Sequence, residues 1–153
     1  MTVRSCFSFD TNILVYAADW RAGRRHEVAA DLLIRAVGTD CVLTLQSLSE
    51  FFQVTTRKGL LSVAEAVVNV DDWRKLFRVV AADEPALPDA MTVVRDHGLS
   101  FWDAMLWATV RRAGCGLLVT EDLQDGRALG GVQFVNPFGE TLPQALVDAL
   151  GGN

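Results

Sequence analysis

Short apolar runs along the chain alternate with longer segments in which apolar residues recur every three or four positions. The runs at 6–9, 41–45, 78–81, 116–120 and 132–135 predict five β-strands, and the first is bounded on both sides by polar residues. The longer segments predict helices at 12–17, 24–37, 46–58, 62–77, 89–97, 100–113 and 142–150. Because strands alternate with helices, the predicted fold class is α/β, a three-layer α/β/α sandwich with a mostly parallel central sheet.

Residues that begin and end helices agree with these boundaries. Gly38 and Gly98 directly follow predicted helices and are typical stop signals. Ser62 and Glu65 have the spacing of a capping box at the start of the 62–77 helix. The length of 153 residues suits one core, and no linker, repeat or low-complexity segment interrupts the pattern. We therefore expect a single domain that spans residues 1–153.

Composition narrows the class of protein. No stretch approaches the roughly 18 apolar residues of a membrane span, and the first residues lack the long apolar region of a signal peptide. Cys6, Cys41 and Cys115 have apolar neighbours, so we expect three buried, reduced thiols and a cytoplasmic protein with no membrane partner. His26 and His97 have no second histidine at ligand spacing, which disfavours a zinc site and a Ser-His-Asp triad.

The net charge of −5 disfavours a protein that coats nucleic acid nonspecifically. It leaves a nuclease possible, because several acids gathered at one metal site would account for most of that charge.

Acidic residues recur where predicted strands end and predicted helices begin. In open α/β sheets, ligands bind beyond the carboxyl ends of the strands, so several of these acids would share one edge of the sheet. The acids in such positions are Asp10, Glu50, Asp103, Glu121, Asp122 and Asp125.

Each acid also has a structural explanation. Asp10 could cap the helix that follows it, and Glu50 and Asp103 each stand three residues after a serine, as in a capping box. An acid near a helix N-terminus gains roughly 0.3–1 kcal/mol from the helix dipole. However, Glu50 and Asp103 are flanked by large apolar residues, where an unpaired carboxylate is costly. Since few lysines are near, divalent cations such as Mg²⁺ become plausible partners.

Four segments resemble, in order, the motifs of PIN-domain ribonucleases, and of the VapC-type toxins of bacterial toxin–antitoxin pairs in particular. The resemblance covers residues 3 to about 136, and its four segments are Asp10-Thr11-Asn12, 47–51, 101–104 and 119–123. It implies an endoribonuclease that uses Mg²⁺ or Mn²⁺ to hydrolyse RNA phosphodiester bonds. It also implies a small antitoxin partner that covers the acidic cleft, and homodimerisation.

The resemblance implies roles for individual residues. Those implied to bind metal and act in catalysis are Asp10, Glu50, Asp103 and Asp122, and those implied to hydrogen-bond within the site are Asn12 and Thr120. Many family members carry an aromatic residue two positions after the last Thr-x-Asp motif, whereas residues 123–127 depart from that pattern. Glu121 and Asp125 therefore remain alternatives to Asp122 as the fourth acid, and we prefer Asp122.

Basic residues could contact RNA phosphates beside such a cleft, although a solvated helix surface explains them equally well. The candidates are Arg21, Arg24, Arg25, Arg57 and Lys58. A signalling receiver domain is disfavoured because Lys58 and Lys75, the only lysines, fall in or at the end of predicted helices. Two alternatives stay open: a non-catalytic RNA- or protein-binding module of the same fold, and a structure-specific DNA nuclease.

Overall fold

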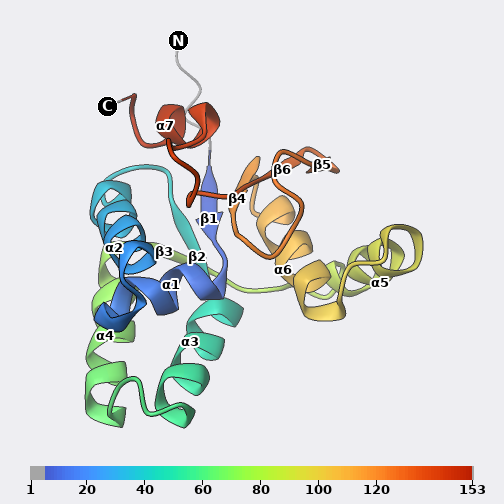
Figure 1. Cartoon of the computed structure of the whole chain (residues 1–153). Helices are drawn as coiled ribbons and strands as arrows, with labels where there is room; N and C mark the ends of the chain where they lie inside the picture. The colour runs from blue at the N-terminus through green and yellow to red at the C-terminus, as the bar shows by residue number, and fades with distance from the viewer. Residues whose placement is uncertain (1–5, 153) are drawn as a thin grey trace.

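A computed structural model describes residues 6–152 of the chain (Figure 1). Strands and helices alternate along most of its length, as the apolar pattern predicts. The elements are β1 (Phe7–Phe9), α1 (Thr11–Ala18), the 3₁₀ helix η1 (Trp20–Ala22), α2 (Arg24–Ala36), β2 (Val42–Thr44), α3 (Leu45–Arg57), α4 (Val63–Leu76), β3 (Arg78–Val80), α5 (Ala86–His97), α6 (Phe101–Arg112), β4 (Leu117–Val119), β5 (Ala128–Leu129), β6 (Val132–Val135) and α7 (Gln144–Ala149).

The sheet is parallel except at one edge. Strands β1, β4, β6 and β5 are hydrogen-bonded in that order, and only β5 runs antiparallel to its neighbour. Strands β2 and β3 form a parallel pair that meets β1 through one bridge between Phe7 and Cys41. Strand β1 is therefore central, and the residue that follows it, Asp10, lies in the middle of the carboxyl edge.

Side chains of the strands alternate between two cores, as the pleat of a strand requires. Phe7 and Phe9 pack with α1, α2, α3 and α7 on one face of the sheet, whereas Leu118 and Phe134 pack with α5 and α6 on the other. Figure 1 shows α1 to α4 on one side of β1 and α5 and α6 on the opposite side. The predicted three-layer α/β/α sandwich is confirmed.

Three of the differences from the predicted elements have a local cause. Helix α5 begins at Ala86, three residues early, because Pro88 is tolerated in a first turn whose N–H groups lack intrahelical partners. The short strand β5 lies inside the segment predicted to be loop, and Gly130 and Gly131, both with positive φ, turn the chain from β5 into β6. Helix α3 begins at Leu45 and is capped by Thr44.

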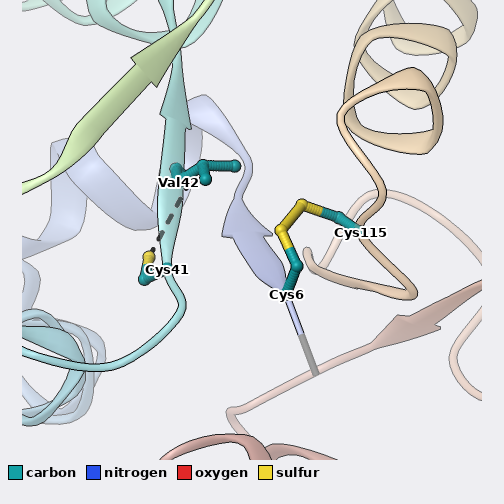
Figure 2. Close-up of a disulfide and its surroundings, with 4 residues drawn as sticks. All are labelled: Cys6, Cys41, Val42 and Cys115. Atoms are coloured by element: carbon teal, nitrogen blue, oxygen red, sulfur yellow. Dashed lines mark hydrogen bonds between the residues drawn. A yellow bond between two sulfur atoms is a disulfide. The ribbon is translucent and has the colours of Figure 1, made fainter. Parts of the chain in front are cut away.

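The prediction of three reduced thiols is wrong for Cys6 and Cys115, which form a disulfide with their Cα atoms 4.3 Å apart (Figure 2). Strands β1 and β4 are adjacent and parallel, so the residues that precede them come together, and the Gly116 N–H donates to the Cys6 carbonyl at 3.1 Å. A sequence separation of 109 hides this pairing from any local pattern. Cys41 is free and buried, as expected, and its thiol lies 3.8 Å from the Val42 carbonyl oxygen.

Within residues 6–152, every helix is too short or too polar to cross a membrane.

Reduction of the disulfide should lower the free energy of unfolding by about 2–4 kcal/mol, because the bond closes a long loop and restricts the unfolded chain. Urea unfolding with and without a thiol reductant measures this difference. The variant Cys115→Ala should have the stability of the reduced protein and should not respond to reductant. A wild-type protein with the same stability in both conditions would contradict the prediction.

Candidate functional site

Four acids come together at the carboxyl edge of the sheet from four separate elements. Asp10 follows β1, Glu50 lies in α3, Asp103 lies in the first turn of α6, and Asp122 follows β4. Figure 1 shows the N-terminal ends of α3 and α6 near the end of β1 from which α1 continues. The strand order, rather than proximity in the sequence, brings these segments to one place.

Asp10 is the most deeply buried of these acids, with 6% of its surface exposed. One carboxylate oxygen accepts a hydrogen bond from the Thr11 N–H at 2.6 Å and caps α1, while the other accepts from the Thr120 hydroxyl at 2.8 Å. Burial raises the pKa of Asp10 to about 6; these two hydrogen bonds oppose the rise, and the charges of Asp122 and Asp103 add to it. Asp10 therefore caps a helix and also faces the other acids.

Glu50 is held by two neutral donors. The Thr11 hydroxyl donates to one oxygen at 2.6 Å, and the Gln46 amide donates to the other at 3.1 Å. The same amide donates to the Trp102 carbonyl at 2.9 Å and so joins α3 to the start of α6. The capping-box explanation fails for Glu50, because Thr44 caps α3 and Glu50 lies in the second turn.

At the start of α6, Ser100 caps the helix by accepting from the Asp103 N–H at 3.4 Å. In a complete capping box, as at the start of α4, the acidic side chain also accepts from the backbone N–H of the capping serine: Glu65 does so from Ser62. Asp103 makes no such bond to Ser100. Its carboxylate is therefore not committed to the helix end. Trp102, beside it, is 61% exposed.

Asp122 is exposed and is fixed by α1. The Asn12 side-chain amide donates to its carboxylate at 2.7 Å, and the Thr120 hydroxyl accepts from its backbone N–H at 3.1 Å. Partial burial raises the pKa of Asp122, the charges of Asp103 and Glu121 raise it further, and the Asn12 hydrogen bond opposes the rise. Asp122 thus belongs to the same electrostatic cluster as Asp10 and Asp103.

The other candidates for the fourth acid have partners elsewhere. Glu121 accepts a hydrogen bond from the Tyr16 hydroxyl and is ion-paired with Arg25 at 3.0 Å. Asp125 accepts from the Asn136 N–H at 2.8 Å, which ties the loop between β4 and β5 to the residue that follows β6. Asp122 as the fourth acid therefore remains a prediction, and these contacts are consistent with it.

The donor set suits a hard divalent cation. Among residues 6–152, none of the ion pairs involves the four acids, so their negative charge is balanced by no basic side chain of that part of the chain. In the same part of the chain, no group of three or more Asp, Glu, His or Cys side chains is arranged to hold a metal ion. Mg²⁺ commonly retains several waters and needs only one or two carboxylates, which fits this arrangement.

The candidate RNA contacts divide into two groups. Arg21 is ion-paired with Asp19 at 3.2 Å, and Arg25 with Glu121 at 3.0 Å. Arg24 donates to the carbonyls of residues 138 and 139 at 2.8 and 2.7 Å. Arg57 and Lys58 are exposed and lie at the end of α3, about two turns from Glu50. A phosphate contact by any of these five residues remains a prediction.

Sequence reasoning missed the side chains that hold the acids in place, namely Thr11, Tyr16 and Gln46. A signal for two of them was present. Tyr16 follows Asn12 by four positions and Gln46 precedes Glu50 by four, so each pair shares one helix face.

This structure is a three-layer α/β sandwich with acids gathered at the carboxyl edge of a parallel sheet. A family model described as "PIN domain" matches residues 8–124. Because the match covers most of the chain, the protein belongs to the PIN-domain family, as the motifs led us to expect. No curated protein sequence matches the chain significantly.

Solved structures with the same fold include toxins and toxin–antitoxin complexes. VapC20 from Mycobacterium tuberculosis, described as a toxin that cleaves the sarcin–ricin loop, has 20% identity and a TM-score of 0.59 over 73% of this chain and 86% of its own. A toxin–antitoxin complex from Klebsiella pneumoniae has 20% identity and a TM-score of 0.62 over 88% and 98%. VapBC2 from Rickettsia felis, bound to a DNA fragment from its promoter, has 15% identity and a TM-score of 0.63 over 86% and 98%. At such identities the likeness shows a shared fold.

Replacing Asp10 with asparagine should stabilise the metal-free protein at neutral pH. The pKa of Asp10 is raised from 3.8 to about 6, so the unfolded chain loses this proton at lower pH than the folded chain does. The free energy of unfolding therefore falls as pH rises from about 4 to about 6. Above that range, the charged Asp10 side chain destabilises the folded protein. The free energy of unfolding of Asp10→Asn should exceed that of the wild type by no more than about 3 kcal/mol at neutral pH.

Urea unfolding of the wild type and the variant in EDTA, at about pH 7.5 and about pH 4, measures this difference in stability. It should vanish at the lower pH, because the side chain at position 10 is then uncharged in both proteins. Asp125→Asn serves as a control, since it replaces an exposed acid of the same region. A variant less stable than the wild type at both pH values would contradict the assignment of a raised pKa.

Proposed function

We propose that this protein is a Mg²⁺- or Mn²⁺-dependent endoribonuclease that hydrolyses RNA phosphodiester bonds as the toxin of a toxin–antitoxin pair. The observation that carries the proposal is the mutual influence of Asp10, Asp103 and Asp122 at one sheet edge, where each carboxylate lacks a basic partner in residues 6–152. Repulsion between neighbouring carboxylates destabilises the folded protein, and a bound cation would offset that repulsion.

Membership of the PIN-domain family supports a nuclease, and the sarcin–ricin loop cleaved by VapC20 is RNA. The family match also favours catalysis over a purely binding role, because all four acidic motif positions are filled in this chain. RNA, rather than structured DNA, is the substrate that these likenesses favour.

In the proposed mechanism, Asp10 and Asp103 would hold the principal cation, and Glu50 and Asp122 would complete or orient its surroundings. A bound divalent cation would supply an activated water and stabilise the leaving oxygen. The protein keeps the acids in place with uncharged donors: Thr120 holds Asp10, and Asn12 holds Asp122. Uncharged donors fix the carboxylates without neutralising them, so their charge remains available to the cation.

Partners and location belong to the same proposal. The Klebsiella pneumoniae and Rickettsia felis structures are toxin–antitoxin complexes, which supports a small antitoxin for this chain. Exposed apolar side chains on α4, at Val63, Val67 and Val68, would suit contact with an antitoxin or with a second copy in a homodimer. A cytoplasmic location now rests on the proposed RNA substrate, since the Cys6–Cys115 disulfide removes the argument from reduced thiols.

Purified protein incubated with total bacterial RNA and Mg²⁺ or Mn²⁺ should produce discrete new ends, which sequencing maps. Asp10→Asn and Asp103→Asn should each lower the cleavage rate by at least about 100-fold, because each removes a charged ligand of the proposed metal. EDTA should also abolish the cuts. Asp125→Asn should retain activity, because the Asp125 side chain accepts from the Asn136 N–H and an asparagine oxygen can still accept that bond.

Undiminished cleavage by a folded Asp10→Asn variant would overturn the metal assignment. Tight RNA binding without cleavage in either metal would instead favour the binding module. Cleavage of structured DNA with RNA left intact would favour the DNA nuclease.

A further inference from the structure

Glu121, the acid directly before Asp122, is bound by two side chains that do not belong to the acid cluster. The Arg25 Nε atom lies 3.0 Å from one carboxylate oxygen, and the Tyr16 hydroxyl donates to the other. The side chain of Glu121 is 15% exposed, whereas that of Arg25 is 52% exposed. Both oxygens of this largely covered carboxylate are therefore occupied.

Arg25 itself lies close to two aromatic rings. Its guanidinium carbon lies 5.9 Å from the ring centre of Tyr16 and 5.3 Å from that of Phe138. These two rings pack edge to face with their centres 5.5 Å apart. These cation–π contacts favour the position of the guanidinium beside Glu121 and connect it to α1 and to the loop after β6.

The loop that carries Asp122 is consequently fixed at three successive residues. Thr120 donates to Asp10, Glu121 is bound by Tyr16 and Arg25, and Asp122 accepts from Asn12. Each contact directs one side chain, so two adjacent acids point to different partners. Only the second acid remains close to Asp10 and Asp103.

The ion pair with Arg25 also affects the charge beside Asp122. Without Arg25, Glu121 would carry an unbalanced charge beside Asp122 and could turn towards the acids. A fifth carboxylate there would repel Asp122 or compete with it for a cation. Arg25 offsets the charge of Glu121 and blocks that rotation.

We propose that Arg25, assisted by Tyr16, is a positioning residue that sequesters Glu121 so that Asp122 alone of the two adjacent acids is presented to the divalent cation. The inference rests on the proposed metal-dependent function. It assigns Arg25 an intramolecular role in place of the RNA-phosphate contact considered from the sequence.

The test is a double-mutant cycle read out as the Mn²⁺ dissociation constant, measured by calorimetry without RNA. Arg25→Ala should weaken Mn²⁺ binding by about 10-fold, as is typical when a partner of a metal-site residue is removed. Glu121→Gln should bind Mn²⁺ nearly as the wild type does, because the amide removes the competing charge and keeps an oxygen for Tyr16. The double variant should regain most of the lost affinity, because it no longer contains an unpaired acid.

Two further variants separate this role from general loss of structure. Arg35→Ala removes an ion-paired arginine from the far end of the same helix and should leave Mn²⁺ affinity unchanged. Tyr16→Phe keeps the ring against Phe138 and removes only the hydroxyl, so it should weaken Mn²⁺ binding less than Arg25→Ala does.

An Arg25→Ala variant with wild-type Mn²⁺ affinity would overturn the inference, and so would a loss that Glu121→Gln does not restore. If Arg25 instead contacts an RNA phosphate directly, Arg25→Ala should keep the wild-type Mn²⁺ affinity and should bind RNA more weakly in EDTA. If the wild type binds Mn²⁺ and Asp10→Asn does not, a failure of the cycle rejects this inference alone. If the wild type binds no Mn²⁺, both this inference and the proposed function fail.

Discussion

The hydrogen bond from Thr120 to Asp10 joins the ends of two adjacent parallel strands, and the arrangement of the acids depends on it. It binds an oxygen of a carboxylate that is 6% exposed, at the point where β1 gives way to α1. The Thr120 hydroxyl also accepts from the Asp122 N–H, so one side chain fixes two of the four acids. The pairing of β1 with β4 therefore determines the geometry of the edge as well as the order of the sheet.

Periodicity was sufficient to predict the layers, because β1, β2, β4 and β6 each contribute buried apolar residues to a core. It could not predict β5, whose two residues are exposed or half-buried and owe their strand conformation to pairing with β6. The predicted start of α5 at residue 89 is three residues late, because the first turn of a helix accepts proline and Pro88 therefore lies inside the helix. The Cys6–Cys115 bond was missed because it follows from strand order, which no local pattern encodes.

The sequence also indicated which residue types would gather at the sheet edge, since an acid after a strand is visible in one dimension. It left open which of the acids at 121, 122 and 125 would face the cluster. Two of the three acids have partners outside the cluster: Tyr16 and Arg25, distant in the sequence, engage Glu121, and the Asn136 N–H, 11 residues further along the chain, engages Asp125. Sequence spacing identified the candidates, and tertiary contacts support the preference for Asp122.

The pairing of Phe7 with Leu117 has a consequence for the chain as it is synthesised. A ribosome releases β1 long before its neighbour β4, and distant strand pairs of this kind close slowly because the intervening chain must first be ordered. A nascent chain that ends before Leu117 would carry Asp10 and Glu50 without the strand that aligns them. Assembly of the acid cluster must therefore wait until most of the chain has emerged, and premature termination would leave a product without it.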